Sequence, residues 1–268
     1  MVNLFCFSCG FLSKITELNF NLIRRSKTLS GHSKWHNIQK TKGAQDAKRA
    51  KIFTKIAREI IVAVKVGGGD PANNSSLAAA VTKAKAANMP NDNIKRTIDK
   101  AAGSAEGSDY ESITYEGYGP SGVAVIVETM TDNRNRTASE MRHYFDKYGG
   151  NIGVSGCVSW SFDRKGVIIV DKEDLDEDDI LGIALEAGAE DFQAEGPVFE
   201  IYTDPIEFQA VVAQLEAANL QFLSAQLEMV PQNYIALTDE DDIKNMRKML
   251  DMFEDNDDVQ EVWHNWEE

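Results

Sequence analysis

The order of secondary-structure signals between Gly166 and Met229 is the feature of this sequence that most constrains its fold. Short apolar runs typical of strands alternate there with longer segments typical of helices. They run strand, helix, strand, strand, helix, strand over residues 166–170, 178–187, 189–193, 198–202, 205–218 and 221–229. This βαββαβ order is that of the ferredoxin-like fold. We therefore predict a ferredoxin-like domain over residues 163–231.

Strand and helix signals on both sides of this unit predict a second α+β domain. Upstream lie strands at 112–118 and 123–129, a helix at 137–148 and a strand at 157–162. Downstream lie a strand at 234–237, a helix at 239–253 and a strand at 259–264. We expect the downstream elements to complete the sheet begun at Ser112. The second domain is then discontinuous, residues 107–162 plus 232–268, and the ferredoxin-like domain is inserted in it.

Residues 31–106 predict a small helical domain. Between Gln45 and Val66 the apolar residues recur at helical spacing on one face, and the opposite face carries Lys48, Lys51, Lys55, Arg58 and Lys65. Glycines 67–69 and Pro71 end this helix, Ser75 or Ser76 caps a second one over 77–87, and Pro90 opens a third over 91–102. The predicted fold class is α+β: an N-terminal helical bundle followed by two α+β domains, the third ferredoxin-like and inserted in the second.

Residues 1–30 form a leader, in which an apolar run precedes the basic residues Arg24, Arg25 and Lys27. That order argues against a secretory signal. Two alternatives remain, an organelle transit peptide and upstream sequence translated ahead of a true start near Leu29, and we favour the second. The leader is then disordered or absent from the native protein. Only three cysteines are present, so we expect a reducing compartment: the cytoplasm, or the mitochondrion if the leader is a transit peptide.

Charge is divided unevenly along the chain. The whole chain has a net charge of −15, but residues 31–102 carry +9 and residues 103–268 carry −27. A basic domain on an acidic body predicts a surface for a polyanion, with the body kept away from it by repulsion. Two other interpretations stay open: two domains that simply differ in charge, and two parts that pair with each other.

The basic segments supply the candidate binding residues. Lysines neutralise phosphates with little demand on sequence, and Trp35 either stacks on a base or anchors the bundle. A second basic spot, at the turn from a strand into the helix at 137, forms a phosphate clamp or is merely exposed beside the helix cap. The candidate nucleic-acid-binding residues are Lys34, Trp35, Lys40, Lys42, Lys48, Arg49, Lys51, Lys55, Arg58, Arg134 and Arg136.

The sequence lacks the catalytic and ligand-binding motifs that would indicate an enzyme. The sequence contains no phosphate loop, dinucleotide fingerprint, nucleophile elbow or zinc-protease motif. His32 and His36 share a helical spacing but have no third metal ligand nearby, and Cys157 is expected to be a buried, inert thiol. No apolar run approaches the roughly 18 residues of a membrane span. We therefore predict no catalytic residues, no metal, no cofactor and no membrane association.

Several motifs, in order, closely resemble the YebC family. They lie at residues 31–35 (GHSKW), 44–49 (AQDAKR), 52–55 (IFTK), 67–71 (GGGDP), 115–120 (YEGYGP), 131–137 (TDNRNRT) and 184–191 (ALEAGAED). The resemblance extends from residue 31 to about 266, and the leader departs from it because family members of bacterial type begin just before GHSKW. It implies three domains, the third inserted in the second.

The resemblance also implies a function in gene expression. The family is described as transcriptional regulators that bind DNA, which makes a non-enzymatic, DNA-binding regulator our first hypothesis. Some members act in translation: a mitochondrial relative activates synthesis of a cytochrome oxidase subunit, and bacterial relatives relieve ribosome stalling at proline runs. The alternative is therefore a ribosome-associated factor that binds ribosomal RNA. An interaction scaffold for an acidic partner protein is a third hypothesis, and the oligomeric state is left open.

Overall fold

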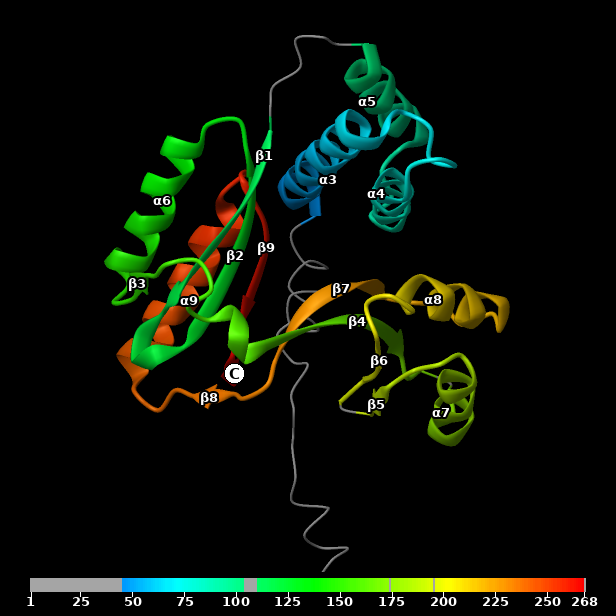
Figure 1. Cartoon of the computed structure of the whole chain (residues 1–268). Coiled ribbons are helices and arrows are strands. Elements are labelled where there is room, and N and C mark those ends of the chain that lie inside the picture. The colour runs from blue at the N-terminus through cyan, green and yellow to red at the C-terminus, as the bar shows by residue number, and fades with distance from the viewer. Residues whose placement is uncertain (1–44, 104–109, 174, 195, 268) are drawn as a thin grey trace, which may run out of the picture. The chain divides into compact units, whose positions relative to one another are not determined.

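The computed structural model describes residues 45–103, 110–173, 175–194 and 196–267 (Figure 1). The fold class predicted from the sequence is confirmed: a helical region is followed by two sheet-containing units, with the second inserted in the first. None of the described helices is long and apolar enough to cross a membrane.

Within the described residues, the N-terminal bundle consists of α3 (Gln45–Gly67), α4 (Ser75–Ala86) and α5 (Asn91–Gly103). Their apolar faces meet in a core that includes Ile60, Leu77 and Ile94. Gly68, with a φ of +85°, ends α3 in the left-handed region that glycine adopts without strain. The expected serine cap is wrong. Asn74 caps α4 instead, accepting a hydrogen bond from the Leu77 amide while its own amide group donates to the carbonyls of Ala63 and Gly68.

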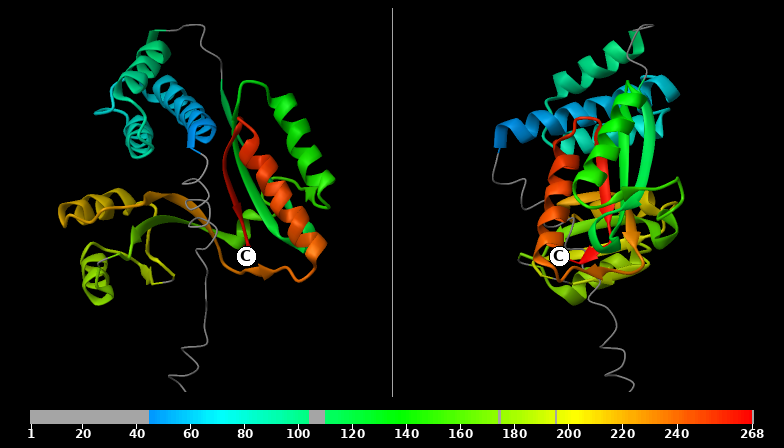
Figure 2. Two further views of the ribbon diagram at one scale, coloured as in Figure 1. Left: turned by 180° about the vertical axis from the view of Figure 1, so that it is seen from behind. Right: turned by 90° about the vertical axis from the view of Figure 1, so that its left-hand side faces the viewer.

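The first sheet has the strand order β3-β1-β2-β9, with all neighbours antiparallel. Its strands are β1 (Glu111–Tyr118), β2 (Ala124–Thr131), β3 (Asn151–Ile152) and β9 (Val259–His264). Helices α6 (Arg134–Lys147) and α9 (Glu240–Asp255) cover one face, where Phe145 and Phe253 pack on the odd-numbered valines of β2 (Figures 1 and 2). Strand β9 comes from the C-terminal end of the chain, so this sheet is discontinuous in sequence.

Two expectations about this sheet are wrong. The strand expected at 157–162 does not form: a short 3-10 helix, η2 (Ser159–Ser161), lies there, and Phe162 is the first residue of the next strand. The carboxylate of Glu116 accepts the amide hydrogens of Gly156, Val158 and Ser159, so these groups are unavailable to a strand ladder. The strand expected at 234–237 is β8 (Ile235–Ala236), which pairs in parallel with β10 (Trp266–Glu267) instead of joining the first sheet.

The inserted unit is ferredoxin-like, as predicted. It comprises β4 (Phe162–Asp171), α7 (Glu177–Glu186), β5 (Asp191–Gln193), β6 (Val198–Thr203), α8 (Phe208–Ala217) and β7 (Ser224–Pro231). The strand order is β5-β6-β4-β7, antiparallel throughout. Apolar residues of α7 and α8 pack on one face of this sheet, for example Leu215 against Ile168 and Ile201.

Candidate nucleic-acid interface

The structure describes side chains for five of the eleven candidate residues. Lys34, Trp35, Lys40 and Lys42 lie outside the described residues, and Lys48 and Arg49 lie in the first turn of α3, where side chains are not described. The five remaining candidates are Lys51, Lys55, Arg58, Arg134 and Arg136.

Three of these five follow one side of α3. Lys51, Lys55 and Arg58 are spaced four and three residues apart, which places them along one ridge about 10 Å long. The other side of the helix is buried in the bundle through Ile56, Ile60 and Val64. The amphipathic pattern of the sequence therefore positions these cations on the side of α3 that does not form the core.

This ridge faces a concentration of carboxylates. We call residues Glu254–Glu261 the acidic turn; it comprises the end of α9, the following turn and the start of β9, and its acids are Glu254, Asp255, Asp257, Asp258 and Glu261. Lys51 Nζ lies 2.7 Å from Asp255 Oδ1. Both side chains are largely exposed, so this pair is held weakly.

Arg58 makes the most extensive contact with the acidic turn. Its Nη1 donates to Asp258 Oδ1 at 2.8 Å, and also to the carbonyl oxygens of Met130 and Asp257. The guanidinium also lies over the Tyr110 ring, 5.4 Å from its centroid. The Arg58 and Asp258 side chains are only 15% and 5% exposed, which makes this pair the anchor of the contact.

Carboxylates of the acidic turn also affect the pKa values of two nearby lysines, Lys55 on α3 and Lys83 on α4. Burial lowers the pKa of Lys55, and the carboxylates that partly oppose this shift are Glu261, Glu254 and Asp257. Lys83 on α4 pairs with Glu59 at 2.7 Å and with Glu261 at 3.0 Å. Burial would lower the pKa of Lys83, but these two carboxylates raise it above its ordinary value.

The charge pattern predicted a basic surface left available to a polyanion, and the structure does not show this for Lys51 and Arg58. Lys51 and Arg58 are paired with carboxylates of the acidic turn, and Lys55 lies in their field. The interpretation in which the two parts of the chain pair with each other describes this region.

The second basic spot also contains a cation that is paired with carboxylates, Arg136, and one that is exposed, Arg134. Asn133 caps α6, because its side-chain oxygen accepts a hydrogen bond from the amide of Arg136. The Arg136 guanidinium bonds Asp132 at 3.0 Å and Asp258 at 2.6 Å, and these bonds raise its pKa. Arg134 is exposed and makes no ion pair among the described residues. Arg134 and Arg136 thus do not form a symmetrical clamp.

Three cations outside the list of candidate residues are more exposed to solvent than Lys51, Lys55 and Arg58. Lys85 near the end of α4 and Lys95 and Arg96 on α5 are exposed, and none of the three forms an ion pair within the described parts of the chain. Helices α4 and α5 share one core, so these residues belong to a single packed unit. We call Lys85, Lys95 and Arg96 the open cations. Their signal in the sequence is the near absence of acids between 71 and 98, where Asp92 is the one carboxylate.

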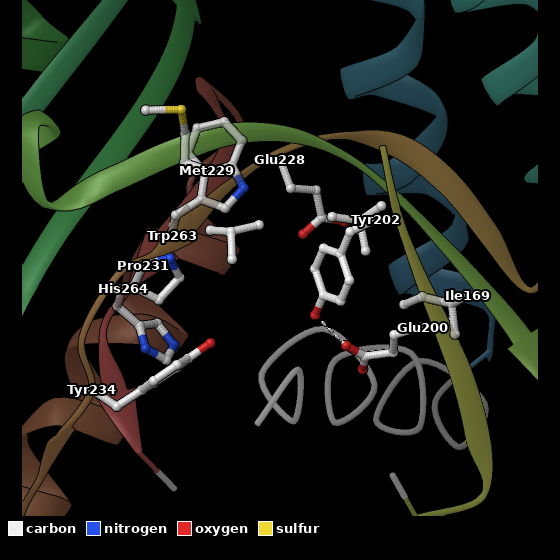
Figure 3. Close-up of a pocket in the computed structure, with 11 residues that line it drawn as sticks. Ile169, Glu200, Tyr202, Glu228, Met229, Pro231, Tyr234, Trp263 and His264 are labelled. Atoms are coloured by element: carbon white, nitrogen blue, oxygen red, sulfur yellow. Dashed lines mark hydrogen bonds between the residues drawn. The ribbon is translucent and has the colours of Figure 1, made fainter. Parts of the chain in front are cut away.

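A cavity of about 40 Å³ lies between the inserted sheet and β9 (Figure 3). Its lining includes Glu200, Tyr202, Glu228 and His264, and the Tyr202 hydroxyl donates to Glu200 at 2.6 Å. Burial, and next the Glu200 charge, raise the pKa of Tyr202. Since one water needs roughly 10–15 Å³, the cavity has room for a few waters.

Other candidate chemistry receives no support from the geometry. Within the residues that the structure describes, no three His, Cys, Asp or Glu side chains are grouped so as to hold a metal ion. Cys157 is partly buried, and burial, then the Glu116 carboxylate, raise the pKa of its thiol. A raised pKa lowers the thiolate fraction, which is consistent with the expected inert cysteine.

Comparisons with known proteins agree with this architecture. A family model described as the TACO1/YebC protein N-terminal domain matches residues 33–104, and one described as the TACO1/YebC second and third domain matches residues 110–266. A "Probable transcriptional regulatory protein" of Clostridium beijerinckii is 58% identical over 239 residues, which are 89% of this chain and 97% of that protein. One from Geobacillus sp. (strain WCH70) is 56% identical over 242 residues, 90% and 98% of the two chains.

A solved structure has the same fold. The crystal structure of a conserved hypothetical protein from Aquifex aeolicus superimposes with a TM-score of 0.76 at 46% sequence identity. The match covers 85% of this chain and 97% of that one.

Proposed function

Since the chain belongs to the TACO1/YebC family, we propose that it is a non-enzymatic, nucleic-acid-binding regulator of gene expression whose helical domain contacts phosphates. Relatives more than 50% identical to it are named probable transcriptional regulatory proteins, and DNA is therefore the first target to test.

The observation that carries this proposal is the group of open cations. Lys85, Lys95 and Arg96 are exposed on the helical domain, whose residues 31–102 carry a charge of +9, and they have no ion-pair partner among the described residues. Such cations gain most when a phosphate backbone replaces the counterions around them. Arg134 is a further exposed cation, on the second domain. The −27 of residues 103–268 restricts how closely a duplex approaches the rest of the molecule.

Phosphate contact alone does not distinguish DNA from RNA. Lysine and arginine neutralise both backbones by the same electrostatic attraction, so the ribosomal RNA alternative rests on the same residues. The distinction comes from the probe: a duplex DNA, a single-stranded RNA and intact ribosomes, compared at matched salt.

The test is a paired charge reversal. We expect Lys95→Glu/Arg96→Glu to weaken binding of a fluorescein-labelled 20-base-pair DNA at least tenfold at 50 mM NaCl, measured by fluorescence anisotropy. The slope of log K against log salt concentration should become less negative by about 2, because two phosphate contacts that each contribute ~0.9 to the slope are lost. Lys244→Glu/Lys248→Glu is the matched control, since both of these lysines are exposed on α9 of the second domain.

Each outcome of this test decides between targets. Loss of affinity confined to DNA supports the transcriptional form of the proposal. Loss confined to RNA, or to co-sedimentation with ribosomes, supports the translational form. Unchanged binding to every probe would show that the open cations are not the binding surface.

A further inference from the structure

The acidic turn lies where a phosphate backbone would have to lie in order to contact the ridge on α3. Lys51 and Arg58 are each paired with a carboxylate of this turn, and Lys55 lies in the field of Glu261, Glu254 and Asp257. A cation neutralised by a carboxylate releases no counterion to a phosphate until that carboxylate leaves. The ridge therefore cannot serve the acidic turn and a nucleic acid at the same time.

Asp258 remains hydrogen-bonded when α3 separates from the acidic turn. Asp258 keeps three other donors if Arg58 departs: Arg136 Nη2 at 2.6 Å, Thr137 Oγ1 at 2.8 Å and Thr131 Oγ1 at 3.0 Å. Removing one partner from a buried pair is costly when the other is left bare. Here the carboxylate stays satisfied, and the departing guanidinium can pair with a phosphate instead.

The Lys51–Asp255 pair is weak enough to exchange. Lys51 and Asp255 have side chains 40% and 74% exposed, and an exposed pair of this kind contributes little stability. Glu261 lies directly opposite Glu128 in the β2–β9 pairing, and burial, then Glu261, raise the pKa of Glu128. This like-charge pair gains hydration when the helices covering it move away, which offsets part of the loss of the Lys83–Glu261 contact.

We propose that the acidic turn, residues 254–261, is an internal competitor that occupies the Lys51–Lys55–Arg58 ridge and is displaced when a nucleic acid binds. This inference rests on the proposed nucleic-acid function and adds its regulation. The free protein binds through the open cations first, and the ridge joins the interface only after the carboxylates have left. A chain with the same lysines but without these carboxylates binds a nucleic acid more tightly.

The first test removes two carboxylates of the acidic turn, Asp255 and Asp257, without touching the cations or the Arg58–Asp258 anchor. Asp255→Asn/Asp257→Asn changes two exposed acids of the turn, and Asp146→Asn/Asp251→Asn, on exposed faces of α6 and α9, is the control with the same change in net charge. Binding of the labelled 20-base-pair DNA and of a labelled 20-nucleotide RNA is measured by anisotropy at 50–200 mM NaCl. We expect the first variant to bind about two- to tenfold more tightly than the control.

The second test follows the contact in the unaltered protein. A carbodiimide joins an ammonium to a carboxylate only when the two are in contact, so it should link Lys51 to Asp255 in the free protein. Mass spectrometry quantifies the linked peptide with and without a saturating oligonucleotide that has hydroxyl ends. We expect most of the link to be lost on saturation.

The outcomes separate this inference from the function on which it rests. If the wild type binds neither probe at any salt concentration, the proposed function fails. If the wild type binds and Lys95→Glu/Arg96→Glu weakens it, the function stands. Equal affinity of the two asparagine variants, or a Lys51–Asp255 link that persists under saturation, then overturns the competitor alone.

Discussion

Replacing Asp258 with alanine should destabilise the second domain more than any other single change in the acidic turn. The carboxylate is 5% exposed and accepts from Arg58, Arg136, Thr131 and Thr137. Removing one member of a buried ion pair typically costs 3–5 kcal/mol, because the partner is left without compensation. Arg136 is 43% exposed and is rehydrated, so we expect about 3 kcal/mol.

The assay is thermal unfolding followed by tryptophan fluorescence, since Trp263 and Trp266 lie in or beside the first sheet. For a chain of this size, about 3 kcal/mol corresponds to a fall in Tm of roughly 6–12 °C. Asp257→Ala is the matched control: its side chain is exposed and only its carbonyl accepts from Arg58. We expect the control to change Tm by less than about 2 °C.

The effect of Asp258 also has a defined pH dependence. Burial alone would raise the pKa of this carboxyl, but hydrogen bonds from Arg136, Thr137 and Thr131 hold it below the ordinary value. A carboxyl with a lowered pKa contributes its stability above the unfolded value near 3.9, and loses it as pH falls through the folded value. The gap in Tm between wild type and Asp258→Ala should therefore be constant from pH 5 to 8 and shrink below about pH 4. A gap under 2 °C at neutral pH would refute the anchoring role of Asp258.

Three further changes test other parts of the structure. Gly166→Ala should destabilise the inserted domain by about 1–3 kcal/mol in urea unfolding, because its Cβ would collide with Thr203 Oγ1 and the Phe208 ring, whereas Gly182→Ala on α7 meets open space and should be neutral or stabilising. Glu116→Gln should cost about 2 kcal/mol and accelerate labelling of Cys157 by a thiol reagent, since it weakens the anchor of the 156–159 turn; Glu111→Gln, exposed on β1, should do neither. Tyr202→Phe should cost about 1–2 kcal/mol by removing the 2.6 Å bond to Glu200, and an unchanged urea midpoint would contradict this.

Local signals in the sequence were sufficient for most of the fold. Glycine after α3 and Pro90 before α5 set helix ends that agree with the structure to within one residue, because these residues act on the backbone at their own positions. The βαββαβ order was predicted from the same kind of signal. The strand expected at 157–162 failed because the competing hydrogen-bond acceptor, Glu116, lies about 40 residues away on β1. No local pattern contains that information.

The candidate site was less predictable for the same reason. The lysines on α3 were found from their spacing, but their partners are about 200 residues further along the chain, in the acidic turn. Lys85, Lys95 and Arg96 were visible as charges in the sequence. They could not be distinguished from the paired cations until the structure placed a carboxylate beside Lys51 and Arg58 and none beside these three.

Oppositely charged segments of one chain attract each other, and counting the charges on each segment separately does not reveal this. A basic segment and an acidic segment repel or attract outside ligands, but they also attract each other, and the connecting chain keeps their mutual concentration high. Some pairing between them is therefore the default, as it is for Lys51 and Arg58. Such pairing neutralises the innermost cations and leaves peripheral ones such as Lys95 exposed. A large charge asymmetry in a single chain thus indicates binding that has to compete with an internal partner, and the cations accessible to an incoming polyanion are those the acidic segment cannot reach.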